Sequence, residues 1–155
     1  MYKRQALEYL NLTRNQLTSL PAEIGQLFQL LELLASGNQL TSLPAAIGHL
    51  NSLRSLHLEQ NKISELPATI GQLADLRYIN LSRNELSALP SEIGQLQALK
   101  KLEVERNQLK DLPAALGLLQ NLEDLQIAYN ELKQLPAEIG PVSYTHLTLP
   151  TIYSV

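Results

Sequence analysis

Residues 76–98, LRYINLSRNELSALPSEIGQLQA, contain the pattern that decides the fold. Their first apolar residues are separated by steps of 3, 2, 5 and 3, whereas an amphipathic helix alternates steps of three and four. Ile79 and Leu81 are two residues apart, so on an extended strand they point to the same face. The stretch therefore predicts a short strand followed by turns, and not one helix of a bundle.

The same pattern recurs every 23 residues without an insertion. Three columns of residues mark this period: Asn15, Asn38, Asn61, Asn84, Asn107 and Asn130; Pro21, Pro44, Pro67, Pro90, Pro113 and Pro136; Gly25, Gly48, Gly71, Gly94, Gly117 and Gly140. They hold six of the eight prolines and six of the seven glycines. One such coil cannot bury its apolar edge alone, but stacked coils share a continuous core. The repeat therefore predicts a solenoid.

Each column has a physical role in such a coil. Asparagine carries donors and an acceptor, so a ladder of asparagines can satisfy the backbone groups of buried turns from coil to coil. Proline presets φ and stops the strand from extending. The Ile-Gly pair fits a short helical or 3-10 segment, with glycine permitting a close approach or a left-handed backbone. Because this outer wall is wider than the strand wall, we predict an α/β solenoid with a concave parallel β-sheet.

The unit LxxLxLxxNxLxxLPxxIGxL resembles the leucine-rich repeat family from Leu7 to Gly140. Similar repeats occur in Ras-group-related scaffold proteins, in Roco-type GTPase arrays and in bacterial proteins. The resemblance implies a right-handed coil with convex helical or 3-10 segments. It also implies a protein-protein interaction module, as in signalling scaffolds, that binds a protein or peptide on its concave face. The alternative is a regulatory segment of a larger enzyme, such as a Roco-like GTPase or a kinase.

The outward strand positions form three columns that vary from coil to coil while the core columns do not. The first reads Tyr9, Glu32, Ser55, Tyr78, Lys101, Asp124; the second Asn11, Leu34, His57, Asn80, Glu103, Gln126; the third Thr13, Ser36, Glu59, Ser82, Glu105, Ala128. All of these except Thr13, Ser36, Ser82 and Ala128 are candidate partner-binding residues. Tyr9, Tyr78 and His57 lead because aromatic side chains contribute strongly to interfaces. A solvated sheet face is the alternative for any one of them.

Six strands spaced by about 4.8 Å give a sheet face on the order of 300–400 Å². A standard interface takes about 800 Å² from each partner. This stretch therefore fits a peptide or part of a protein surface. In the second coil Ala35 takes the place of a core leucine, which predicts looser packing, and Leu34 faces outward.

Composition narrows the function further. The net charge of −3 gives no long-range attraction for nucleic acid or an anionic membrane. The 155 residues include no cysteine, and the first residues lack the apolar stretch of a signal peptide, so we expect a cytoplasmic protein. We expect no enzyme activity, no cofactor and no metal, because the carboxylates are spread along a shallow face. His57 shares its strand face with Glu59, but no second histidine joins them to complete a zinc site.

The chain enters and leaves the pattern in mid-repeat. We expect residues 1–140 to form an array of about six repeats, truncated at both ends, and residues 141–155 to be a non-repeat tail. At a period of 23, positions 145, 148 and 150 should be apolar but hold Thr, Thr and Pro. One interpretation is a cap that adds a β-like segment over residues 142–149. The other follows from a resemblance of residues 142–151 to translated sequencing-adapter read-through, which would place the end of the natural sequence near Gly140.

Overall fold

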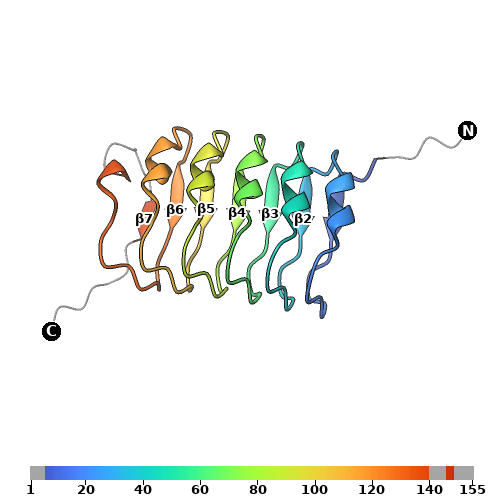
Figure 1. Cartoon of the computed structure of the whole chain (residues 1–155), viewed down its shortest axis with the longest axis horizontal. Coiled ribbons are helices and arrows are strands. Elements are labelled where there is room, and N and C mark those ends of the chain that lie inside the picture. Colours follow the sequence, from blue (N-terminus) through green and yellow to red (C-terminus); the bar gives the residue numbers. More distant parts are fainter. Residues whose placement is uncertain (1–5, 140–145, 149–155) are drawn as a thin grey trace, which may run out of the picture.

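The computed structural model describes residues 6–139 and 146–148 (Figure 1). Short strands and 3-10 helices alternate along these residues: β1 (Tyr9–Asn11), η1 (Ala22–Gln26), β2 (Glu32–Leu34), η2 (Ala45–His49), β3 (Ser55–His57), η3 (Ala68–Gln72), β4 (Tyr78–Asn80), η4 (Ser91–Gln95), β5 (Lys101–Glu103), η5 (Ala114–Leu118), β6 (Asp124–Gln126), η6 (Ala137–Ile139) and β7 (His146–Thr148). Figure 1 shows the coils side by side, with the 3-10 helices along one wall and the strands along the other. This architecture confirms the predicted solenoid.

All seven described strands form one parallel sheet in sequence order. From β1 to β6 each residue pairs with the residue 23 positions later, as Leu56 does with Ile79. Strand β7 joins with a step of 22, because Leu125 pairs with Leu147. A shift of one residue therefore restores a strand register that the 23-residue period misses. The interpretation of residues 142–149 as a β-like segment agrees with β7 in position, and the domain boundary at 140 stays a prediction.

The core consists of the aliphatic columns, which are fully buried in the middle coils. Leu56, Ile79 and Leu102, at the centres of β3, β4 and β5, have no exposed surface. Ala35 is also fully buried. Leucines of the first coil, such as Leu12 and Leu17, are only partly buried, although they pack against the same core. Burial of this continuous apolar column is the main favourable contribution to folding of the stack.

The asparagine side chains join each coil to the one before it. Asn61 donates from Nδ2 to the carbonyl oxygens of Leu58 at 2.9 Å and of Ala35, in the previous coil, at 3.0 Å. Its Oδ1 accepts a hydrogen bond from the backbone N–H of Leu40 at 3.0 Å. Asn38, Asn84, Asn107 and Asn130 repeat the links to the preceding coil. Asn15 of the first coil is exposed and bonds only within its own turn.

The residue before each of these asparagines adopts a left-handed backbone. Gly37 has a φ of 65°, and the other coils place Arg14, Gln60, Arg83, Arg106 and Tyr129 there with φ between 53° and 59°. The pattern did not predict this position, although Gly37 is the single glycine outside the glycine column. The left-handed alternative for the column glycines was wrong, since none described has a positive φ.

The column glycines are instead required by close contact between 3-10 helices. A Cβ added to Gly94 would lie 2.5 Å from the carbonyl oxygen of Ala115 in the next coil. Each described 3-10 helix from η1 to η5 follows a proline with φ between −66° and −69°, as expected of a ring that fixes φ. The outer wall is therefore set by proline entry and glycine contact.

Candidate interaction face

The strand register brings the three outward columns together on one face of the sheet. Tyr9, Glu32, Ser55, Tyr78, Lys101 and Asp124 are register partners in turn, as are Asn11, Leu34, His57, Asn80, Glu103 and Gln126. We call these two columns, with the third column that follows each strand, the concave face. Most of its side chains are partly buried, whereas Tyr9 and Asn11 on β1 are exposed and Ser36 and Ala128 are buried.

His57 lies at the centre of one cluster on this face. Its Nε2 is 2.8 Å from the hydroxyl of Ser55 and 3.4 Å from a carboxylate oxygen of Glu32 on the preceding strand. Its ring centroid is 4.8 Å from that of Tyr78, with the planes tilted by 54°. The sequence placed Glu59 beside His57, but the contacts of His57 run to Glu32, Ser55 and Tyr78. The side chain is thus held from both neighbouring strands.

Lys101 is the centre of a second cluster, which consists of charged residues. Its Nζ lies 2.6 Å from Glu103 and 3.0 Å from Asp124, which also accepts a hydrogen bond from Gln126 at 3.1 Å. The hydrogen bond to Glu103, and then that to Asp124, raise the pKa of Lys101 against the opposing effect of burial. Lys101 therefore stays charged at neutral pH, and its charge is shared between two carboxylates.

Tyr78 lies between these two clusters. Burial raises the pKa of its phenol, and the negative charges of Glu103 and Glu59 raise it further. The phenol is accordingly neutral at physiological pH and remains a hydrogen-bond donor. Carboxylates from the strand on either side therefore surround one aromatic ring.

Two carboxylate oxygens on the concave face are shielded from water but lack a hydrogen bond. They are Oε2 of Glu59 and Oδ1 of Asp124, neither of which has a donor within the described part of the chain. A buried acceptor without a donor costs free energy. A donor from a bound partner would remove this cost at both positions.

The described residues contain no group of three or more His, Cys, Asp or Glu side chains arranged to hold a metal ion. His57 meets one carboxylate, and His49 is exposed in η2 on the opposite wall. The geometry of the concave face thus offers a shallow surface of mixed polar and aromatic groups.

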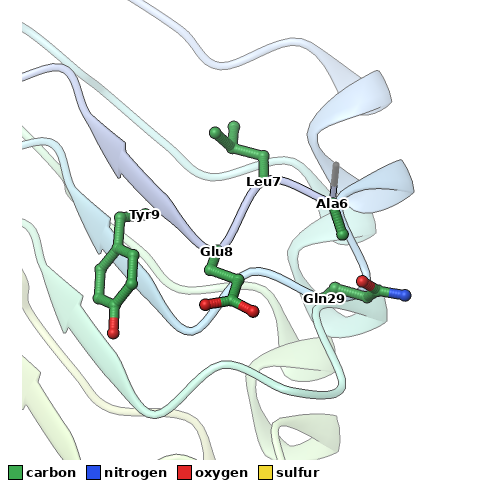
Figure 2. A pocket seen from close by; sticks show the side chains of 5 residues that line it. All are labelled: Ala6, Leu7, Glu8, Tyr9 and Gln29. Carbon is green, nitrogen blue, oxygen red and sulfur yellow. The ribbon is translucent and has the colours of Figure 1, made fainter. Parts of the chain in front are cut away.

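A separate hollow lies at the first coil, lined by Ala6, Leu7, Glu8, Tyr9 and Gln29 (Figure 2). Figure 2 shows Leu7 and Glu8 pointing in opposite directions from adjacent positions of the chain. Glu8 is the single charged group among the lining residues. The hollow shares Tyr9 with the concave face but brings together none of the clustered polar groups described above.

One aromatic contact at the rim was not predicted. The guanidinium carbon of Arg106 lies 4.4 Å from the centre of the Tyr129 ring. Both residues occupy the left-handed position that precedes an asparagine. The signal available in the sequence was their 23-residue spacing, which places neighbouring members of any column in contact.

Comparison with family models identifies the repeat. A model described as a leucine-rich repeat region matches residues 67–147, slightly more than half of the chain, and two further leucine-rich repeat models match residues 40–86 and 6–27. The chain belongs to the leucine-rich repeat family. A search of curated proteins found no match.

Solved leucine-rich repeat structures resemble the chain closely. A leucine-rich repeat protein of Leptospira interrogans is 42% identical, with a TM-score of 0.87 over 90% of this chain and 36% of its own. The ectodomain of the Arabidopsis thaliana membrane receptor kinase GASSHO1/SCHENGEN3, in complex with CASPARIAN STRIP INTEGRITY FACTOR 2, is 39% identical with a TM-score of 0.80 over 87% of this chain and 17% of its own. A PEPR1–AtPEP1 complex matches at 28% identity and a TM-score of 0.83, over 92% of this chain and 21% of the matched chain.

The chain thus spans well under half the length of these leucine-rich repeat relatives. Its folded repeats and their structural neighbours support a protein-interaction module in general. No helix among the described residues is long and apolar enough to cross a bilayer.

Proposed function

We propose that this leucine-rich repeat chain binds an extended peptide or a protein segment on its concave face and acts by binding, not by catalysis. The observation that carries the proposal is the clustering of partly buried polar and aromatic side chains along β2 to β6. His57, Tyr78 and Lys101 are held there by contacts from neighbouring strands.

The physical properties of these side chains favour recognition. An aromatic ring supplies contact area with few rotatable bonds, and a half-buried charged pair gives direction to a partner. Because neighbouring side chains already hold each group in place, little rotamer entropy is lost on binding. The two solved complexes with a named second component lend support by analogy.

The area of the face favours a narrow partner. A sheet face of a few hundred Å² is smaller than the roughly 800 Å² that each side of a standard protein interface buries. An extended segment laid across the strands would use such an area fully. A cytoplasmic partner and location stay predictions.

A peptide-display selection tests the proposal. The full chain would be used to select from a random 12-residue library, and enriched peptides would be measured by fluorescence anisotropy. We expect the triple variant His57→Ala, Tyr78→Ala, Lys101→Ala to weaken binding at least tenfold. A matched variant outside the sheet, Phe28→Ala, His49→Ala, Lys110→Ala, should bind like the parent chain, because all three residues are exposed. Equal binding by both variants would reject concave recognition.

A further inference from the structure

The concave face carries an excess of negative charge at its centre. In the six coils with described side chains, its three columns hold Glu32, Glu59, Glu103, Glu105 and Asp124 against a single lysine, Lys101. That lysine is already bound between Glu103 and Asp124. The carboxylates of Glu59 and Glu105 lie outside this pair.

Tyr78 provides an aromatic surface within this acidic region. The charges of Glu59 and Glu103 both act on its phenol, and the His57 ring packs at 4.8 Å. A cation over a tyrosine ring is favourable, and carboxylates on either side add charge-assisted hydrogen bonds. The chain shows the same preference internally, where Arg106 lies over the ring of Tyr129.

The unsatisfied oxygens specify what a partner must bring. Oε2 of Glu59 and Oδ1 of Asp124 are shielded and lack donors among the described residues. An arginine guanidinium carries five N–H donors and no acceptor, and a lysine ammonium carries three. An acidic partner would leave both oxygens unpaired and add repulsion.

We propose that the concave face docks a basic extended segment, with an arginine or lysine side chain seated on Tyr78 between Glu59 and Glu103. This inference rests on the proposed function and adds the chemistry of the partner. Exposed arginines border the face, among them Arg77 at the start of a strand and Arg83 after it. Solvent-exposed charges contribute little to affinity, so the partly buried carboxylates at the centre determine the preference.

The test compares three labelled 12-residue peptides by anisotropy: alternating Arg and Ser, alternating Gln and Ser, and alternating Glu and Ser. We expect the arginine peptide to bind most tightly. The double variant Glu59→Gln, Glu103→Gln should weaken it about tenfold, the effect of losing hydrogen bonds to charged groups. The double variant Glu65→Gln, Glu85→Gln changes the net charge equally at exposed positions outside the strands and should bind like the parent chain.

The outcomes separate the two proposals. Equal weakening by both double variants, or tighter binding of the glutamine or glutamate peptide, would overturn the basic partner. If the library-selected peptides lose affinity for the His57, Tyr78, Lys101 triple variant but show no enrichment in Arg and Lys, concave binding stands and the inference falls. If concave substitutions change no binding at all, both fall.

Discussion

The Oδ1 atom of Asn84 lies 2.9 Å from the backbone nitrogen of Ile63, which belongs to the preceding coil. The Nδ2 of the same amide donates to the carbonyl oxygens of Leu81 at 2.9 Å and Leu58 at 3.0 Å. One buried side chain therefore satisfies three backbone groups in two coils.

Replacing Asn84 should be costly for stability. We expect Asn84→Ala to lower the free energy of unfolding by about 3 kcal/mol, because it leaves buried backbone groups without partners. Asn15→Ala, at an exposed asparagine of the first coil, should cost less than about 1 kcal/mol. Urea unfolding followed by circular dichroism measures both. Similar losses for the two variants would contradict a role that depends on burial.

Gly94 should not tolerate even a methyl group. A Cβ there would lie 2.5 Å from the Ala115 carbonyl oxygen and 2.7 Å from the Ala115 Cβ, so the backbone of one coil must move. We expect Gly94→Ala to lower the free energy of unfolding by about 1–3 kcal/mol. Ser91→Ala, at an exposed position of the same 3-10 helix, should change it by less than about 0.5 kcal/mol. A harmless Gly94→Ala would show that the outer wall is not closely packed.

Gly37 should be sensitive for a different reason. Its φ of 65° is left-handed, while an added Cβ would meet only the flexible side chain of Arg14 at 3.2 Å. We expect Gly37→Ala to cost about 1–2 kcal/mol, the penalty for a left-handed L-residue. Gly37→Asn should cost less, because asparagine adopts this conformation more readily. Thermal unfolding of both variants tests the order, and a smaller cost for alanine would refute the conformational explanation.

Tyr78 should make stability depend on alkaline pH. Its folded pKa is raised by burial and then by Glu103, so the unfolded chain loses this proton first as pH rises. The contribution of the phenol is fully present below its ordinary pKa of about 10 and declines as pH rises above that value. We expect the stability difference between the parent chain and Tyr78→Phe to shrink or reverse between pH 9 and 11. Tyr9→Phe, at an exposed tyrosine, serves as the control in the same urea titrations.

The period alone was sufficient to predict the strands, the three outward columns and the close approach of the glycines. A repeat constrains the backbone strongly because every coil must satisfy its neighbours in the same way. The details that were missed depend on rotamers and on single residues. Sequence spacing offered Glu59 as the neighbour of His57, but the imidazole lies nearer Glu32 across the strand pair. Nothing in the spacing separates these two options.

The left-handed position and the last strand were missed for related reasons. Five of the six coils use a residue other than glycine at the left-handed position, so composition gave no signal except at Gly37. Strand β7 follows a step of 22 residues, and a search at a fixed period of 23 passes over it. Both cases show that a fixed column locates backbone roles but does not reveal where a different residue, or a different spacing, fills the same role.

The substantial contacts between the described elements run from one coil to the next, strand with strand and 3-10 helix with 3-10 helix. Nothing in the described stack depends on a distant coil in the way that a sandwich or a barrel depends on its closing strand. Whole units of 23 residues can therefore be duplicated or lost during evolution with only two junctions to readjust. The breadth of the surface offered to a partner can change by gene-level copying, while the geometry of each unit is preserved.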